Sequence, residues 1–428
     1  MVSWMSGPYP ASITKFIQRP AIDAKACAVA SKILADVRTR GDKAVTERIK
    51  EFDGALLPPD KWHVKKTEFN TARETVKPDF ITSVREAHKR IIKFARAGEK
   101  HDWTIFSPKG GVLGEQFAPL KRVGIYIPGG RTPLVSTALM TVPLAKAAGV
   151  PEIVVCSPVD SSTKMSPHLL YALEFAGATE IYKIGGIQAI GAMAYGTKTI
   201  AKVQKIVGPG GPYVTAAKRC VYGTVALDLV AGPSEIAILA DESAQPEYVA
   251  ADLLSQAEHG SGMEKLFMVT SSANLASAVR TELLKQTKTL KRRSTIIRVL
   301  NEGTLLVIVN NLDKGIELCN RFAPEHMEIM VRGPRKWLKK VRNAGAVFIG
   351  AWSPECIGDY IAGPSHVLPT GATAKMFSGL FINDFRKRTS TITFTRADLQ
   401  EVLPVIKCLS RVESFSAHAK SAQIRFNR

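Results

Sequence analysis

Hydrophobic and polar positions along the chain follow two different periods. Residues 25–52 and 78–98 repeat apolar side chains at helical spacing and contain few helix breakers. From residue 122 onward, β-rich runs alternate with alanine-rich helical stretches; the runs are RVGIYIP, EIVVCSP, EIYKIGG, KIVGPG, EIAILAD, KLFMVTSS, GTLLVIVNN and GAVFIG. This alternation predicts βαβ units and mainly parallel sheets. A basic segment with helical spacing after about residue 381 predicts a small separate unit or a docking arm.

The length of the chain indicates more than one hydrophobic core. At 428 residues it exceeds the roughly 250–300 residues over which a single core grows, so we expect two or more domains. No uninterrupted apolar stretch approaches the roughly 18 residues of a membrane span, and the N-terminus lacks the pattern of a secretory signal. The six cysteines are scattered without Cys-x-x-Cys spacing. We therefore expect reduced thiols in a cytoplasmic protein without a membrane partner.

The charge balance is strongly basic. There are 58 Lys and Arg residues against 38 Asp and Glu residues, which gives a net charge of +20. Such a balance is typical of nucleic-acid binding or of an anionic substrate. However, the basic residues are spread along the chain without a long run, and no RNP, KH or zinc-finger pattern is present. We expect a solvated basic surface rather than a nucleic-acid partner.

Four glycine- and proline-rich segments follow predicted strands. They are YIPGG (126–130), KIGG (183–186), VGPGG (207–211) and VAGPSE (230–235). In open α/β sheets, ligands bind beyond the carboxyl ends of the strands, where glycine permits close approach of the backbone. The chain has no G-x-G-x-x-G fingerprint, and each turn alone is typical of structure. Together the four turns favour a nucleotide-sized ligand.

The segment SQAEH places Gln256 and His259 three residues apart. On a helix both side chains would lie on one face and could share a metal ion. A carboxylate and a second imidazole would complete a zinc set, and Asp359 and His418 are available. The alternative is a capped helix end with a surface histidine, which needs no metal.

Two further segments contain ionisable groups in unusual settings. FAPEHMEIM (322–330) places Glu325 beside His326 next to an apolar run, which supplies two proton-handling groups or only a surface turn. CIGDYIAGPSHVLPT (356–370) is a polar loop without periodicity, and such loops often bind ligands. Cys356 in this loop is a possible nucleophile, but a buried, inert thiol is the expectation we prefer.

Taken together, these segments resemble the histidinol dehydrogenase family. The resemblance covers nearly the whole chain and rests on many phrases in one order. They are VGIYIPGG, PLVSTALMTVPLAKAAGVPEIVVCSP, GPYVTAAKR, DLVAGPSEIAILAD, AADLLSQAEH, NRFAPEHMEI, NAGAVFIG and GDYIAGPSHVLPTG.

The resemblance implies an α/β fold with two Rossmann-like domains, parallel-rich sheets and small N- and C-terminal segments. We expect an N-terminal arm (1–22) and a second Rossmann-like domain (126–234) inserted into a discontinuous first one (23–125 and 235–380). We also expect a C-terminal segment (381–428) that is exchanged between the subunits of a homodimer.

The resemblance also implies zinc and NAD as cofactors and assigns residues to them. The implied zinc ligands, which also contact substrate, are Gln256, His259, Asp359 and His418. The implied catalytic pair is Glu325 and His326, with His326 also touching substrate; the other substrate contacts are Ser234, His366 and Glu413, and the NAD contacts are Tyr126, Gln188 and position 211. Glu413 and His418 would act across the dimer interface.

The implied reaction oxidises the amino alcohol L-histidinol to L-histidine through histidinal, with two hydrides passed to NAD. Neighbouring residues on an extended chain point to opposite sides. We therefore expect His326 to serve as the base in hydride transfer and Glu325 to activate water, rather than both acting as one dyad.

The chain departs from the family at three places. Gly211 stands where the family has an asparagine that contacts NAD, Ser365 replaces an asparagine before His366, and RVESFSAHA differs from the usual C-terminal phrase. These changes leave two alternatives open. One is an NAD-dependent dehydrogenase of another alcohol, such as a sulfonated diol, towards which Arg131 and the basic charge lean. The other is a basic nucleic-acid or scaffold protein that has lost catalysis.

Overall fold

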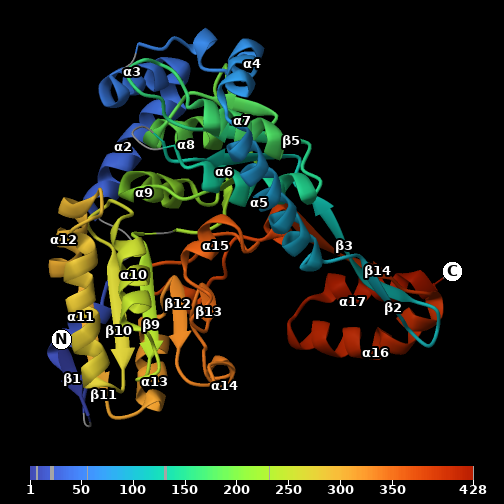
Figure 1. Ribbon diagram of the computed structural model, residues 1–428. Coiled ribbons are helices and arrows are strands. Elements are labelled where there is room, and N and C mark those ends of the chain that lie inside the picture. Colours follow the sequence, from blue (N-terminus) through green and yellow to red (C-terminus); the bar gives the residue numbers. More distant parts are fainter. Residues whose placement is uncertain (6–7, 20–23, 55, 130–132, 231, 428) are drawn as a thin grey trace. The chain divides into compact units, whose positions relative to one another are not determined.

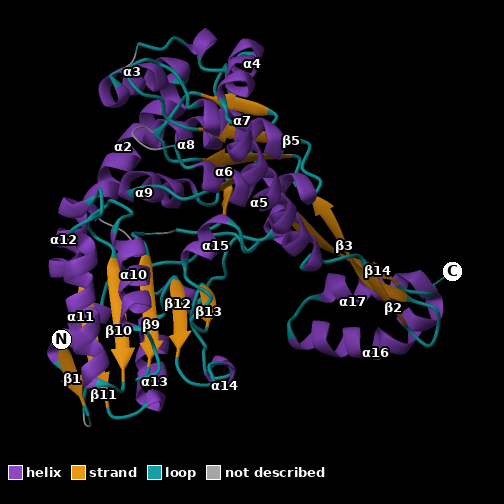
Figure 2. Cartoon of the chain, viewed as in Figure 1, coloured by secondary structure: helices purple, strands orange, loops and turns teal. Residues whose placement is uncertain are grey.

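The computed structural model describes residues 1–5, 8–19, 24–54, 56–129, 133–230 and 232–427. They form two compact units. The first contains residues 1–98 and 120–385, and the second contains residues 99–119 and 386–428. Figure 1 follows the chain from one end to the other, and Figure 2 shows the same view by type of element.

A six-stranded parallel sheet forms one half of the first unit. Its order is β1 (Val2–Trp4), β11 (Thr304–Val309), β10 (Lys265–Thr270), β9 (Glu235–Ala240), β12 (His326–Met330) and β13 (Ala346–Ile349). Counted from β9, the strands β9 to β13 follow the order 3-2-1-4-5 of doubly wound dinucleotide-binding folds.

Helices cover both faces of this sheet, which explains why its central strands are continuous apolar runs. One face packs against α10 (Pro246–Ala257), α11 (Ala273–Thr287) and α12 (Arg293–Glu302). The other face packs against α1 (Ala11–Ile17), α13 (Leu312–Phe322) and α14 (Arg335–Leu338).

A five-stranded parallel sheet forms the other half of the first unit. Its order is β6 (Glu180–Tyr182), β5 (Glu152–Cys156), β4 (Arg122–Tyr126), β7 (Lys205–Val207) and β8 (Ala226–Leu227), again 3-2-1-4-5. One face packs against α2 (Ala24–Arg40), α3 (Asp42–Asp53), α8 (Gly186–Tyr195) and α9 (Pro212–Val221). The other face packs against α4 (Lys66–Thr75), α5 (Pro78–Ala97), α6 (Val135–Ala147) and α7 (Pro167–Ala176).

Short elements complete the first unit: α15 (Cys356–Tyr360) and the 3-10 turns η1 (Pro59–Lys61), η2 (Thr373–Lys375) and η3 (Ile382–Phe385). None of the helices in the described part of the chain is both long and apolar enough to cross a membrane.

The second unit is an antiparallel ribbon with two helices. Strands β14 (Arg386–Thr393), β3 (Val112–Pro119) and β2 (Trp103–Phe106) pair in that order. They are followed by α16 (Arg396–Val412), α17 (Ser416–Gln423) and the 3-10 turn η4 (Ile424–Phe426). Thr395 and Asp398 close the start of α16 as a capping box, in which each side chain bonds the other's backbone N–H.

The α/β class with two parallel, doubly wound sheets is confirmed, but the expected grouping of segments needs correction. Residues 23–125 do not join 235–380, because helices α2–α5 and strand β4 pack into the five-stranded half. Residues 1–22 are more than an arm, since β1 is an edge strand of the six-stranded sheet. The exchange of residues 381–428 between subunits stays a prediction.

Candidate functional site

The six-stranded sheet gathers most of the predicted site residues at the amino ends of two adjacent strands. β9 and β12 pair in parallel with His326 opposite Ile236, so Ser234 and Glu325 enter neighbouring strands from the same edge. Helix α10 returns from the far edge and ends at Ala257. The C-terminal end of α10 therefore lies at this edge (Figure 1). Gln256 belongs to the last turn of the helix, and His259 follows its C-cap residue, Glu258.

Asp359 and two histidines form a connected row at this edge. His259 Nδ1 lies 3.0 Å from Ser234 Oγ, and His259 Nε2 lies 3.8 Å from Asp359 Oδ2. Asp359 Oδ1 lies 3.4 Å from His366 Nδ1. The imidazole of His366 lowers the pKa of Asp359 against the opposing effect of burial, which is the largest influence on this carboxyl. Asp359 is therefore an anion placed between two imidazoles.

The last turn of α10 holds a buried amide next to a carboxyl. Gln256 is fully buried, and neither side-chain amide atom has a hydrogen bond of good geometry with the described residues, although the amide lies close enough to Glu355 to lower the pKa of that carboxyl. A buried amide normally has well-formed hydrogen bonds, so the oxygen of Gln256 is available as a ligand. Amide oxygen, the imidazole of His259 and the carboxylate of Asp359 form a donor set suited to zinc. His259 itself is partly exposed.

The catalytic pair predicted from the sequence is buried, and both side chains contact the main chain of Glu235. Glu325 Oε2 accepts a hydrogen bond from the Glu235 N–H (3.0 Å), and His326 Nδ1 lies 3.2 Å from the Glu235 carbonyl oxygen. A carbonyl can only accept, so Nδ1 carries the proton and Nε2 keeps its lone pair. Burial raises the pKa of Glu325 well above its usual value and lowers the pKa of His326 to about 4.

The expectation that these two side chains point to opposite sides is wrong. His326 Nδ1 lies 3.7 Å from Glu325 Oε2. Glu325 precedes the first residue of β12 and follows a turn in which Ala323 adopts a left-handed conformation, with φ of 51°. Strand alternation therefore does not apply to this pair.

The sequence did not point to Glu355, which completes the surroundings of His326. Glu355 Oε1 lies 3.4 Å from His326 Nε2, and Glu355 Oε2 accepts a hydrogen bond from Ser255 Oγ (3.2 Å). Burial, with a contribution from the charge of Asp359, raises the pKa of Glu355 to about 8. Ligand atoms of His326, Glu355 and Asp359 lie within 4.8 Å of one another, which makes this trio a second possible metal set.

Behind Glu355 lie two more buried carboxyls. Glu328 Oε1 accepts the backbone N–H of Glu355 (2.9 Å), and the carboxyl of Asp252 on α10 lies close enough to Glu328 for each to affect the pKa of the other. Burial raises the pKa of Asp252 to about 6 and that of Glu328 well above its usual value. Two carboxyls in contact hold a proton between them. The available signal was Glu328 itself, a charged residue inside the apolar run HMEIM.

The predicted nucleotide contacts lie at the carboxyl ends of the five-stranded sheet. Tyr126 ends β4, and its buried hydroxyl accepts the N–H of Gly186 (3.1 Å). Gln188 on α8 is buried with both amide atoms unpartnered among the described residues. Gly211 is the N-cap of α9, beside the switch point between β4 and β7. This is where doubly wound sheets bind their ligands.

Glycine is required at one of these turns. Gly208 has a φ of +110°, and a Cβ there would lie 2.1 Å from the carbonyl oxygen of Tyr126. The turn is held by Asp228, which accepts the Gly208 N–H (2.7 Å) and pairs with the buried ammonium of Lys218 (2.5 Å). The fourth predicted turn, 230–235, instead leads into the amino end of β9. Arg131 lies outside the described residues.

Two predicted site residues belong to the second unit. Glu413 is the C-cap of α16, and His418 lies on α17 with its ring stacked on Phe415, at 5.1 Å between centroids. Both residues are exposed. Since this unit is described by itself, their expected roles at the site stay predictions.

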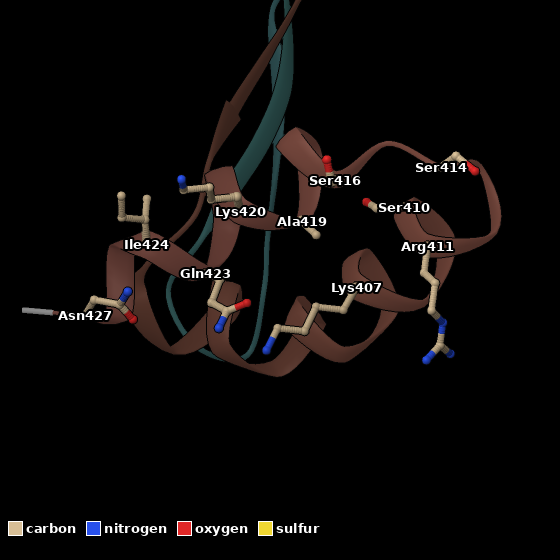
Figure 3. A pocket seen from close by; sticks show the side chains of 10 residues that line it. All are labelled: Lys407, Ser410, Arg411, Ser414, Ser416, Ala419, Lys420, Gln423, Ile424 and Asn427. Carbon is tan, nitrogen blue, oxygen red and sulfur yellow. The ribbon is translucent and has the colours of Figure 1, made fainter.

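A cavity of about 600 Å³ between α16 and α17 is lined by cationic and hydroxyl side chains. In Figure 3 the ends of Lys407, Arg411 and Lys420 point in different directions rather than toward one centre. The cavity therefore lacks the converging charges of a built anion site.

Two smaller expectations also meet the structure. Cys356 is exposed rather than buried, so that part of the expectation is wrong. Partial desolvation and the nearby carboxyl of Glu355 still raise the pKa of its thiol, which argues against a reactive thiolate. Ser365, at the departure from the family pattern, donates its hydroxyl to the carbonyl of Met140 (2.9 Å). His366 beside it lies 3.3 Å from Thr137 Oγ1.

Comparisons with known proteins establish the family of the chain. The family model of histidinol dehydrogenase matches residues 18–426. The chain belongs to the histidinol dehydrogenase family. This membership makes the protein an oxidoreductase and connects it with histidine biosynthesis.

Individual members of the family match over nearly their whole length. The histidinol dehydrogenase of Heliobacterium mobile is 40% identical over 414 residues, which cover 96% of this chain and 97% of that protein. The histidinol dehydrogenase of Moorella thermoacetica is 43% identical over 394 residues, with 92% and 93% covered. The crystal structure of histidinol dehydrogenase from Elizabethkingia anophelis superposes with a TM-score of 0.94 at 35% identity, covering 100% of this chain and 98% of that chain.

Proposed function

We propose that the protein oxidises L-histidinol to L-histidine through histidinal, in two successive oxidations that use NAD and zinc. The observation that supports this most is the row of His259, Asp359 and His366 at the sheet edge that also holds the His326–Glu325 pair, with the buried amide of Gln256 on the last turn of α10. These groups combine a set of metal ligands with a base at one edge of the sheet. Family membership does not favour the alternative of a basic scaffold protein.

His326 is the base of the proposed mechanism. Its Nδ1 proton is directed to the Glu235 carbonyl, so the lone pair on Nε2 is available to take the proton of the substrate hydroxyl. Its lowered pKa keeps the ring neutral at pH 7. Each oxidation requires this proton transfer, so His326 acts twice in the sequence.

Glu325 activates water for the step between the two oxidations. The aldehyde must be hydrated before the second oxidation, and a carboxylate takes a proton from the attacking water. The raised pKa of Glu325 makes its carboxylate a stronger base than a free one. The N–H of Glu235 holds one oxygen of this carboxyl in place.

Both cofactors fit residues of this chain. Zinc, when bound by Gln256, His259, Asp359 and His418, would hold the substrate nitrogens as a template that orients the reacting carbon. NAD, near Tyr126, Gln188 and position 211, supplies the hydride acceptor; the unpartnered amide of Gln188 supports this placement. Ser234, His366 and Glu413 are the proposed additional substrate contacts.

The experiment is NADH formation measured by absorbance with histidinol, with and without a chelator. We expect activity that the chelator removes and added zinc restores, and that His326→Ala abolishes. His168→Ala, on α7 with its ring against Phe80, is the matched control and should keep full activity. No NADH from histidinol at saturating NAD and zinc, with a sulfonated diol oxidised instead, would overturn the proposed substrate.

We also propose a homodimer that shares its active sites. Helix α16 supports it, since Val405, Leu409 and Val412 form an apolar stripe that is 57–77% exposed, followed by the exposed Phe415. Such a stripe is typical of an interface. Free thiols at all six cysteines support the proposed cytoplasmic location.

Mixing two inactive variants tests the sharing of sites. If His418 of one subunit serves the site of the other, refolding His326→Ala together with His418→Ala forms heterodimers with one intact site and restores activity. Refolding each variant alone is the control and should restore none. If the mixture forms heterodimers and remains inactive, the sites are not shared.

A further inference from the structure

Arg19, from the N-terminal segment, has a buried guanidinium group with several hydrogen-bond partners. Its guanidinium pairs with both carboxylate oxygens of Glu235, through Nε to Oε1 and through Nη2 to Oε2 (2.6 Å). The side chains are 7% and 3% exposed. Nη2 also donates to the carbonyl of Phe322 (2.9 Å), and the guanidinium carbon stands 3.6 Å from the centre of the Phe322 ring. Nη1 donates to the carbonyl of Ile17 (3.1 Å).

Glu235 and Phe322, the two distant partners of Arg19, are both connected to the catalytic pair. The main chain of Glu235 binds Glu325 through its N–H and His326 through its carbonyl, while its side chain also accepts the N–H of Gly371 (3.0 Å). Phe322 ends α13, three residues before Glu325. Arg19 therefore joins the start of β9 to the turn that leads into β12.

We propose that Arg19 is a positioning residue for the catalytic pair, acting through the main chain of Glu235 and the turn that begins at Phe322. This inference rests on the proposed function, since Glu325 and His326 are its reacting groups. Within the described part of the chain, the guanidinium of Arg19 bonds Glu235, Ile17 and Phe322 and neither catalytic side chain, so its influence is indirect.

The physical reason is the sensitivity of catalysis to small displacements. A shift of about 1 Å at a reacting group can cost 10²-fold in rate. Without Arg19, the carboxylate of Glu235 is buried without its charge partner, which forces β9 and the Phe322 turn to readjust. Lysine cannot replace the planar fork that binds two carboxylate oxygens, a carbonyl and an aromatic face together.

The test compares Arg19→Ala and Arg19→Lys with a matched control in the full-length, zinc-loaded protein. The control is Arg122→Ala. Arg122 is also a buried arginine at the amino end of a strand, where it pairs with Glu152 and Glu180 in the five-stranded sheet. Steady-state kinetics at saturating histidinol and NAD, melting temperatures and guanidinium rescue are measured for each variant.

We expect Arg19→Ala to lower kcat by about 10- to 100-fold, with both KM values within about twofold of the wild type. Arg19→Lys should recover only part of this loss. Guanidinium chloride at millimolar concentration should raise the kcat of Arg19→Ala severalfold, because the ion fits the vacated site. Arg122→Ala should lower the melting temperature. At assay temperatures below that melting temperature, its kcat should equal that of the wild type.

Several outcomes would overturn the inference. They are an unchanged kcat in folded Arg19→Ala, an equal loss of kcat in folded Arg122→Ala, or the absence of any guanidinium rescue. If Arg19→Ala does not fold, Arg19→Lys provides the test. A wild-type kcat in Arg19→Lys would show that the planar guanidinium group is not required. An inactive wild type would instead refute the proposed function, which keeps the two failures apart.

Discussion

Replacing Glu355 by glutamine keeps the shape of the side chain and removes one ionisable group from the buried carboxyl cluster. In the folded protein, burial raises the pKa of Glu355 from 4.5 to about 8. Between these two values the folded state binds a proton that the unfolded state has lost. Stability contributed by this group is therefore full below about pH 4.5 and is lost as the pH rises towards 8.

The magnitude follows from the cost of one pKa unit, about 1.4 kcal/mol. Over the three pH units from 5 to 8, Glu355 should lower the free energy of unfolding by up to about 4 kcal/mol. Asp252 and Glu328 behave in the same direction. The free energy of unfolding of the wild type therefore falls more steeply with pH than Glu355 alone requires. The difference in this free energy between wild type and Glu355→Gln isolates the contribution of Glu355.

The assay is urea unfolding in the presence of chelator at pH 5, 6, 7 and 8, followed by circular dichroism. We expect the two proteins to diverge as the pH rises, with Glu355→Gln the more stable at pH 8. Glu302→Gln, at an exposed position, is the matched control and should follow the wild type. Parallel loss of stability in wild type and Glu355→Gln would show that Glu355 is already ionised and that the burial argument is wrong.

Three substitutions test other parts of the site. Gly211→Asn should lower the KM for NAD severalfold, because a Cβ at this N-cap meets nothing within 4 Å; an unchanged KM at saturating histidinol removes position 211 from the NAD site. Gly345→Ala should destabilise by about 1–3 kcal/mol and lower kcat, because its Cβ would lie 2.6 Å from the carbonyl oxygen of Glu325; unchanged kinetics would show that this turn can shift freely. Asp228→Asn should cost about 3–5 kcal/mol in calorimetry by leaving the buried Lys218 unpaired; a loss below 1 kcal/mol would contradict that reasoning.

The sequence predicted the fold class because strand and helix periods are local properties. The buried runs of β9 and β12 are continuous in the sequence, and each is followed by a helical stretch. The assignment of α2–α5 failed because an amphipathic helix does not record which sheet it covers. The small residues Ala26 and Ala30 on α2 pack in the core of the five-stranded half, yet they would fit either sheet.

Contacts between distant segments could not be read from the sequence. Glu355 reaches His326 only because the loop after β13 returns to the site, and no local pattern records that path. The second unit was also missed in part. Its strand β2 is exposed at every residue, so it lacks the alternation that identifies a half-buried strand.

The pairing of β1 with β11 has a consequence for the synthesis of this protein. Val2 pairs with Val307, and the ion pair of Arg19 cannot form until Glu235 has been synthesised. At about 5–20 residues per second, the first residues leave the ribosome roughly 15–60 s before their strand partner exists. The helices and strands of the five-stranded half, all within residues 24–227, can assemble during that interval. During that interval β1 has no strand partner, so its backbone N–H and C=O groups stay available for pairing with other extended segments.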